Sequence, residues 1–115
     1  MSRIIPLDFE VLPGAKAFFK TIRKKDKSLL QKYKTAITEL QLDPTLGEEK
    51  KGDLSGVFCF DIKHNKTSYE LAYTVEEKED GELLIIILAG TRENFYGALK
   101  LYLKSSGIKK RISGK

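Results

Sequence analysis

Hydrophobic and polar positions change their spacing several times along the chain, and each change predicts a different element. In residues 15–23 the apolar side chains recur at three- and four-residue steps, which is the spacing of one helix face. A second stretch of this kind starts near Asp26 or Ser28, both good N-cap residues, and ends at Asp43-Pro44. The short link between the two stretches predicts a helical hairpin.

Strand-like patterns lie on both sides of this hairpin. Residues 4–11 are rich in β-branched and aromatic side chains and include Pro6, so they predict an edge strand. Residues 54–63 and 68–75 alternate between apolar and polar positions, as strands with one buried face do. Residues 83–88 are continuously apolar, which predicts a central strand covered on both faces. The polar links between the last three segments favour antiparallel hairpins.

Three further segments complete the expected fold. Residues 43–53 are expected to form a loop, residues 95–103 have the spacing of a short helix, and residues 105–107 end it. Residues 108–115 carry only positive charges and are expected to be a disordered tail after a single domain of residues 1–107. The order β-α-α-β-β-β-α predicts an α+β fold. In it the N-terminal strand and the helical hairpin pack on an antiparallel sheet, with the helices gathered on one face.

Charge and composition narrow the range of partners. The chain of 115 residues has a net charge of +5 and a pI of about 9.3. This charge favours a nucleic acid, an anionic membrane or an acidic protein as partner, unless it serves only solubility. No apolar run approaches the roughly 20 residues that span a bilayer, and the N-terminus lacks the apolar stretch of a signal peptide. We therefore expect a cytoplasmic protein with no membrane partner.

The sequence contains few residues for metal or nucleophilic chemistry. Cys59 is the single cysteine and His64 the single histidine, so we expect no disulfide within one chain and no metal site rich in these residues. His64 lies in an expected hairpin turn without a placed nucleophile, and Cys59 has no base nearby in the sequence. We expect no metal and no organic cofactor.

Four stretches, taken in their order and spacing, are similar to the motifs of a known family. They are Leu40-Gln41-Leu42-Asp43-Pro44-Thr45-Leu46-Gly47, Lys51-Gly52-Asp53-Leu54-Ser55-Gly56-Val57-Phe58, Tyr69-Glu70-Leu71-Ala72-Tyr73-Thr74-Val75 and Ile87-Leu88-Ala89-Gly90-Thr91-Arg92-Glu93-Asn94-Phe95-Tyr96. They look like an L…dP…G junction, an L-x-G-x-[YW] strand entry, a Y-R-[IL]-x-Y-x-[VI] strand and a G-x-R-x-x-x-Y ending. Over residues 13–102 the chain therefore resembles the RelE/ParE superfamily of toxins from bacterial type II toxin–antitoxin modules.

The resemblance implies a toxin that is neutralised by a cognate antitoxin. RelE-like members of the superfamily cleave mRNA on the ribosome, whereas ParE-like members act on DNA gyrase. RNA cleavage there uses the 2′-hydroxyl of the RNA as nucleophile, so the protein must supply a base and cations around the phosphate. Arg92 matches the family's arginine after the last strand and would stabilise the phosphate. Tyr96 matches the tyrosine that follows and would orient the RNA or stack on it.

The sequence departs from the family pattern on the face of the expected RNA cleft. Glu70 stands where many members have arginine, and Cys59 and Asp61 occupy positions that are often basic in RNA-cleaving members. Alternation places these three residues on one face. Three interpretations follow: Glu70 is a general base with Arg92 as phosphate clamp, or Glu70 pairs with Arg92 or Lys63 in a structural network, or the protein binds a protein target and does not cleave RNA.

Four lysines are the expected contacts to the RNA backbone, namely Lys50, Lys51, Lys63 and Lys66, although the first two also suit a solvated loop. The leading hypothesis is a toxin that inhibits translation as a ribosome-linked endoribonuclease. One alternative is a non-enzymatic toxin that binds DNA gyrase or another protein. The other is a basic nucleic-acid-binding module without toxicity.

Overall fold

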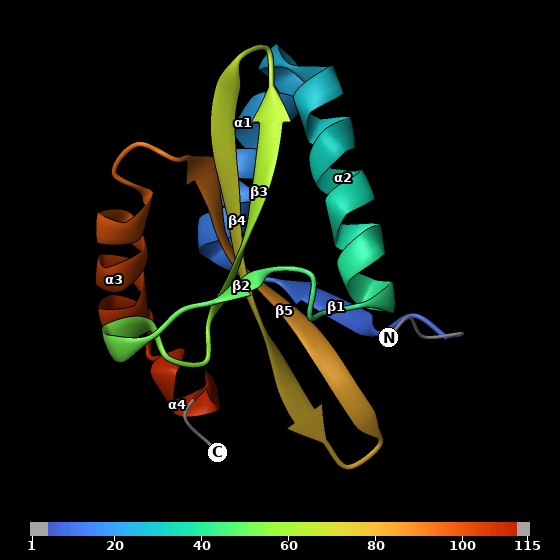
Figure 1. Cartoon of the computed structure of the whole chain (residues 1–115), viewed down its shortest axis with the longest axis vertical. Coiled ribbons are helices and arrows are strands. Elements are labelled where there is room, and N and C mark those ends of the chain that lie inside the picture. The colour runs from blue at the N-terminus through green and yellow to red at the C-terminus, as the bar shows by residue number, and fades with distance from the viewer. Residues whose placement is uncertain (1–4, 113–115) are drawn as a thin grey trace.

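One mixed β-sheet organises the protein, which we describe from a computed structural model covering residues 5–112 (Figure 1). The strands are β1 (Asp8–Val11), β2 (Glu48–Glu49), β3 (Phe58–His64), β4 (Thr67–Lys78) and β5 (Gly81–Thr91). Their order in the sheet is β1-β5-β4-β3-β2. The antiparallel hairpins β3–β4 and β4–β5 were predicted and are confirmed. The expected antiparallel sheet is present in these strands, and β1 joins it by a parallel pairing with β5 that the sequence did not predict.

The N-terminal strand β1 is an edge strand, as predicted, but it is shorter than residues 4–11. It begins at Asp8, and the preceding Leu7 bonds to the end of a helix and not to a strand. The Leu7 amide donates to the carbonyl of Gln41 at 3.0 Å, and the Gln41 amide group donates back to the Leu7 carbonyl at 2.6 Å. Pro6 has no N–H to offer a ladder. Residue 4 lies outside the described residues.

The predicted helical hairpin is confirmed as α1 (Pro13–Lys25) and α2 (Lys27–Leu42). Pro13 occupies the first turn of α1, where a missing N–H costs no hydrogen bond. The hairpin covers one face of the sheet with its apolar stripes. Tyr33 of α2, which is fully buried, donates its hydroxyl to the carbonyl of Glu70 on β4 at 3.0 Å. This bond ties the hairpin to the middle of the sheet.

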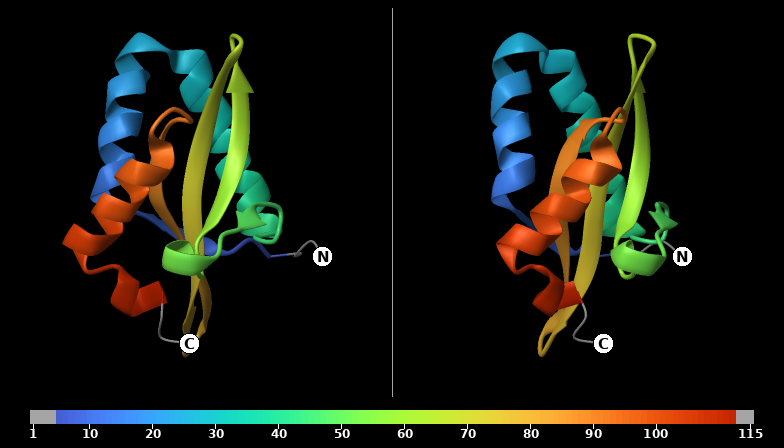
Figure 2. Two further views of the ribbon diagram at one scale, coloured as in Figure 1. Left: turned by 60° about the vertical axis from the view of Figure 1, so that its left-hand side comes forward. Right: turned by 90° about the vertical axis from the view of Figure 1, so that its left-hand side faces the viewer.

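Helix α3 (Phe95–Ser106) covers the opposite face of the sheet, so the expectation that all helices gather on one face is wrong. Figures 1 and 2 show α3 and the α1–α2 hairpin on either side of the strands. The reason lies in β5, where Leu84 and Ile86 face the hairpin while Ile85 and Ile87 face α3. A strand that is apolar on both faces needs cover on both. The prediction of a central, doubly covered strand over residues 83–88 is therefore confirmed.

The expectation of a disordered tail from residue 108 is wrong for residues 108–112. These residues include a short helix, α4 (Lys109–Ile112), with Ile108 and Ile112 buried in the core beneath α3. Arg111 also forms ion pairs with Glu10 at 3.1 Å and with Glu76 at 2.8 Å. The positive charges of this segment led to the expectation of disorder. Its two apolar residues, Ile108 and Ile112, are four positions apart and therefore share one helix face. Residues 113–115 lie outside the described residues.

The expected loop 43–53 contains the two-residue strand β2 and a 3-10 turn, η1 (Gly52–Leu54). Tyr73 of β4 anchors this segment, because its hydroxyl donates to the Pro44 carbonyl at 2.7 Å and accepts from the Gly47 amide at 2.9 Å. A Cβ at Gly47 would lie 2.5 Å from the Tyr73 oxygen, so glycine is required for this close approach. The anchored segment delivers β2 to the edge of β3.

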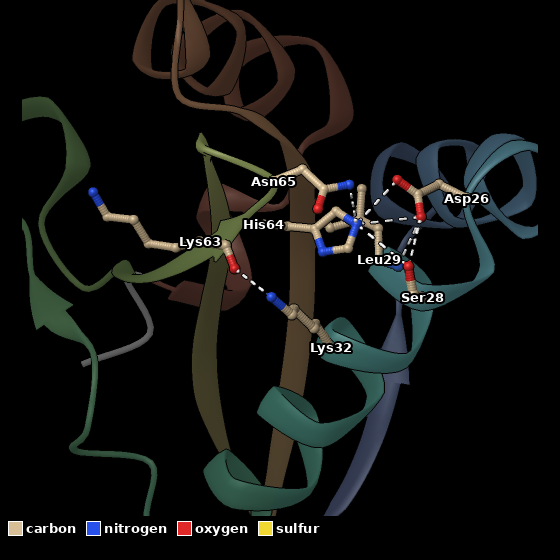
Figure 3. Close-up of polar contacts among 7 residues, drawn as sticks. All are labelled: Asp26, Ser28, Leu29, Lys32, Lys63, His64 and Asn65. Carbon is tan, nitrogen blue, oxygen red and sulfur yellow. Dashed lines mark hydrogen bonds and ion pairs between the residues drawn. The ribbon is translucent and has the colours of Figure 1, made fainter.

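Asp26, between α1 and α2, links the turn of the helical hairpin to His64 at the end of β3 (Figure 3). Its carboxylate caps α2 by accepting from the Leu29 amide at 3.1 Å, and it also lies 3.1 Å from Nε2 of His64 on β3. The Leu29 amide is the main reason that the pKa of Asp26 lies below its usual range. Ser28 contacts the same His64 nitrogen at 3.5 Å. A Ser-His-Asp catalytic relay needs its two partners on opposite ring nitrogens, so this cluster is structural.

Replacing Asp26 with alanine is expected to lower the melting temperature by roughly 5 °C, because the cap of α2 and the link to His64 are lost together. Asp26→Asn keeps an oxygen for the Leu29 amide and should lose less. Thermal unfolding followed by circular dichroism measures both. Lys27→Ala, at an exposed neighbouring position, is the control. A loss no larger than that of the control would contradict the capping role.

Candidate functional site

A polar cleft of about 270 Å³ lies on the part of the sheet that α1 and α2 leave uncovered. Its walls come from the segment around β2, from β3, from β4, from the chain just after β5 and from the start of α3. The lining residues are Leu46, Glu48, Lys50, Cys59, Phe60, Asp61, Glu70, Arg92 and Tyr96. Acidic, basic and aromatic side chains from five separate parts of the sequence thus meet in one place.

Strand register and one turn bring the central residues together. Asp61 on β3 and Glu70 on β4 are direct cross-strand partners, so their side chains leave the sheet on the same face. Arg92 follows β5, and its amide donates to the Ser68 carbonyl at 2.9 Å, which holds it beside β4. Asn94 then takes a left-handed conformation with φ of 61° and turns the chain into α3.

Arg92 is held between the two carboxylates. Its Nε donates to Glu70 Oε2 at 2.9 Å, and its Nη2 lies 2.7 Å from Asp61 Oδ1. The Arg92 side chain is 49% exposed, whereas Glu70 is completely buried beneath it. The pairing of Glu70 with Arg92, one of the alternatives that the sequence left open, is therefore present. Asp61 and then Glu70 raise the pKa of Arg92, so its guanidinium stays protonated.

Burial dominates the protonation of Glu70. Burial first, and the neighbouring Asp61 second, raise the pKa of the Glu70 carboxyl to about 7 against the opposing effect of Arg92. Glu70 Oε1 has no hydrogen-bond partner among the described residues, which is a further cost for an ionised group there. The pKa of Asp61 is lowered, first by its interaction with Glu70 and then by Arg92. Asp61 is therefore the first of the pair to ionise, and Glu70 keeps its proton until about pH 7.

Lys50 and Tyr96 form the second half of the cleft. The Lys50 ammonium lies 4.8 Å from the centroid of the Tyr96 ring, a cation–π distance, and 3.1 Å from Glu48 Oε1. Burial lowers the pKa of Lys50, but the contacts to Glu48 and Tyr96 outweigh it, so the net pKa is raised. Lys50 therefore remains a cation. The Tyr96 ring packs edge-on against Phe95 at 5.8 Å, which orients it at the start of α3.

Four of the residues expected from the sequence meet in this cleft, namely Glu70, Arg92, Tyr96 and Lys50. The other three lysines do not line it: Lys51, Lys63 and Lys66 are exposed elsewhere. Glu48 was not among the expected site residues, because the pattern of residues 43–53 predicted a loop. The spacing of Glu48 and Lys50, two residues apart as on one strand face, is the signal that would have found it.

Cys59 lines the cleft but is unsuited to nucleophilic chemistry. It is buried, and burial raises the pKa of its thiol to about 12. The thiolate is the reactive form, so the thiol is inert at neutral pH. Between residues 5 and 112, no three or more histidine, cysteine, aspartate or glutamate side chains gather in a way that could hold a metal ion. The helices within the same residues are too short or too polar to cross a membrane.

The protein is a small α+β domain with a polar cleft on its sheet. The sequence model of the ParE-like toxins of type II bacterial toxin–antitoxin systems matches residues 12–100. The chain belongs to this family, which confirms the resemblance to the RelE/ParE superfamily. Comparison with curated proteins gives no significant match.

Two solved structures share the fold. The YoeB/ParE toxin from Agrobacterium tumefaciens has a TM-score of 0.64 and 18% identity, over 75% of this chain and 99% of the other. A chain of the RelBE2 toxin–antitoxin complex from Mycobacterium tuberculosis has a TM-score of 0.56 and 16% identity, over 80% of this chain and 98% of the matched chain. At this identity the likeness concerns the fold, and function is argued from the cleft.

Proposed function

We propose that this toxin inhibits translation by cleaving mRNA on the ribosome, with the polar cleft as its active site. The observation that carries the proposal is the half-exposed guanidinium of Arg92, which two carboxylates hold in place. These bonds use Nε and Nη2 of a group that has five N–H donors. The donors on the outer edge are suited to a phosphate, which arginine binds with two parallel bonds.

In the proposed reaction the RNA 2′-hydroxyl gives its proton to a base and attacks the adjacent phosphorus. The bond from phosphorus to the 5′-oxygen of the next nucleotide breaks, a 2′,3′-cyclic phosphate forms, and the departing oxygen takes up a proton from water. Negative charge builds on the phosphate oxygens in the transition state, and a fixed cation stabilises it more strongly than mobile water does. Arg92 supplies that cation, with Lys50 beside it. Tyr96 orients the nucleotide, and its ring also holds Lys50 in place.

The two glutamates of the cleft take different roles in this proposal. A general base must come within hydrogen-bond reach of the 2′-hydroxyl. Glu70 is buried behind Arg92, so we assign it the positioning of Arg92 and not the role of a base that the sequence suggested. Glu48, whose side chain is 79% exposed at the cleft, is accessible to a substrate hydroxyl and is our candidate base.

The three lysines outside the cleft would contact the RNA backbone beyond the cleavage point. Lys51 precedes η1, and Lys63 and Lys66 lie at the β3–β4 turn, all of them exposed. Each lysine–phosphate contact adds to the dependence of binding on salt concentration. The cognate partner of the toxin is an antitoxin, and we place its action on the ribosome, hence in the cytoplasm.

A protein target such as DNA gyrase is the second candidate. Two observations favour it: the family is ParE-like, and the cleft carries three carboxyl groups, on Glu48, Asp61 and Glu70, beside the two cations of Lys50 and Arg92. A cleft with this balance attracts a polyanion less strongly than a purely basic one.

Induced expression in bacteria tests the two candidates. Growth is followed while primer extension maps the 5′ ends of cellular transcripts. Growth arrest with new 5′ ends inside translated regions is the result we expect. Growth arrest with intact transcripts and rising DNA-damage signalling would replace the ribonuclease by a gyrase-directed toxin, and unimpeded growth would favour a nucleic-acid-binding module.

A further inference from the structure

The chain between α2 and β3, residues 43–57, forms an arm that crosses from the side of α2 to the side of α3 (Figures 1 and 2). It follows α2, which covers one face of the sheet, whereas its residues Leu54 and Val57 are buried with α3 on the other face. Glu48 and Lys50, two residues of this arm, line the polar cleft. The geometry of the cleft therefore depends on where the arm is held.

The backbone pairing between the arm and the sheet is short. β2 has two residues, which pair with two residues of β3, and beside them the Lys50 amide donates to the Val57 carbonyl at 2.8 Å. A ladder of this length stabilises a segment only weakly, and a segment with few buried contacts opens at a low free energy. Side-chain bonds from the body of the sheet are therefore needed to fix the position of the arm.

Two adjacent residues of β4, Tyr73 and Thr74, supply such bonds. The Tyr73 hydroxyl bonds to the backbone of Pro44 and Gly47, before β2 in the chain. The Thr74 hydroxyl donates to the carbonyl of Gly56 at 2.7 Å, after β2 in the chain. Neighbouring residues of a strand point to opposite faces of a sheet. The two side chains consequently hold the arm from both faces, at points on either side of the pair that carries Glu48.

The two hydroxyl groups are attached to well-packed side chains. Tyr73 is completely buried and Thr74 is 5% exposed. The Tyr73 ring also stacks on Phe58, with 5.4 Å between the ring centroids. Removal of either hydroxyl would leave backbone groups of the arm without their partner, which costs free energy unless they move to reach water. Loss of a hydroxyl is therefore expected to displace the arm and to leave the sheet in place.

We propose that Tyr73 and Thr74 are positioning residues of the cleft, which hold the arm so that Glu48 and Lys50 share the cleft with Arg92. The placement of the arm follows from the hydrogen bonds and the burial, whereas its effect on RNA cleavage rests on the proposed function. Neither Tyr73 nor Thr74 is among the residues that line the cleft, so both act through the arm. A displacement of about 1 Å in a catalytic group can slow a reaction by roughly 10²-fold.

Hydrogen exchange of the Lys50 amide, followed by NMR in the full chain, tests the placement of the arm. Tyr73→Phe keeps the ring, removes the hydroxyl and should speed up this exchange at least about tenfold, while the amides of β5 stay protected. Thr74→Val removes the other hydroxyl and should act in the same direction, whereas Thr74→Ser keeps a hydroxyl and should stay close to the wild type. Tyr102→Phe is the matched control, because the Tyr102 hydroxyl also accepts from a glycine amide, that of Gly14 at 3.2 Å, but outside the arm.

Cleavage of a defined mRNA on ribosomes, measured under single-turnover conditions over a range of toxin concentrations, tests the effect on the reaction. Tyr73→Phe should lower the maximal rate about 10–100-fold and change the half-saturating concentration less than about threefold, because Arg92 still binds phosphate. Thr74→Val should also lower the maximal rate, and Thr74→Ser and Tyr102→Phe should cleave like the wild type. Loss of folded protein alone would raise the apparent half-saturating concentration and leave the maximal rate unchanged.

The two measurements have separate failures. Unchanged exchange of the Lys50 amide in both Tyr73→Phe and Thr74→Val would overturn the proposal, and so would faster exchange with a wild-type rate of cleavage. The Thr74 pair decides the matter in the event that Tyr73→Phe does not fold. Absence of cleavage by the wild type would refute the proposed function, and the exchange measurement would then decide by itself whether Tyr73 and Thr74 hold the arm.

Discussion

Replacing Arg92 with alanine is expected to abolish both growth arrest and transcript cleavage on induction. The guanidinium lies in the cleft beside Lys50 and Tyr96, and its alignment by Asp61 and Glu70 cannot be reproduced by water. Removing a fixed donor from a developing negative charge typically costs about 10²–10³-fold in rate. Growth curves and primer extension of the variant beside the wild type measure the effect. An Arg92→Ala protein as toxic as the wild type would refute the proposed site.

Two controls separate loss of chemistry from loss of folding in this experiment. Arg92→Lys keeps a positive charge but cannot bind both carboxylates and a phosphate at once, so it should recover only a small part of the activity. Lys104→Ala, on an exposed position of α3, should remain fully toxic. Circular dichroism of the purified variants completes the comparison, because Arg92→Ala leaves Glu70 without the hydrogen bond from Arg92 Nε. Glu70 can keep its proton in that case, so we expect the fold to persist.

The stability of the wild type is expected to fall as pH rises from about 4.5 to about 7, because of Glu70. In the unfolded chain this carboxyl loses its proton near pH 4.5, whereas in the folded protein burial holds the proton until about pH 7. The folded state thus binds more protons in this window, and the stabilisation present at low pH is lost as pH rises. A tenfold change in a protonation equilibrium corresponds to about 1.4 kcal/mol, so the total loss is on the order of 1–3 kcal/mol.

Glu70→Gln is the matched variant for this pH dependence. Glutamine cannot ionise but keeps an oxygen that can accept from Arg92 Nε. Urea unfolding of both proteins between pH 4.5 and pH 8 should show that the wild type loses stability relative to the variant as pH rises. Asp61 acts in the opposite sense, because its pKa is lowered in the folded protein. The stabilisation that it contributes is present above its pKa in the unfolded chain and is lost only as the pH falls below that value. Parallel pH profiles for the two proteins would show that Glu70 is ionised in the folded state.

The same geometry connects these two predictions. Asp61 and Glu70 lie opposite each other on β3 and β4, and Arg92 neutralises the charge that they share. A lone arginine on the sheet would be mobile, whereas here two bonds orient it and leave its outer edge to a ligand. The two carboxyl groups that depart from the family pattern thus hold in place the residue that we propose binds phosphate.

Local patterns determined the elements that depend on neighbours in sequence. The stripes of apolar residues predicted α1 and α2, and Asp26 and Asp43 marked the ends of α2 correctly. The continuous apolar run predicted the doubly covered strand β5. These signals are readable because helical and strand periodicity acts within a few residues. The order of the motifs was enough to identify the toxin family, which the family match confirms.

Only the tertiary structure decided what depends on distant pairing. Three features join segments that lie far apart in the chain. They are the parallel pairing of β1 with β5, the packing of α3 on the second face of the sheet, and the burial of Ile108 and Ile112. The sequence named Arg92 and Glu70, but not that Glu70 would be fully buried beneath the guanidinium. Whether a carboxyl faces solvent or supports an arginine depends on the pairing of β3, β4 and β5, which brings Asp61, Glu70 and Arg92 together from separate segments.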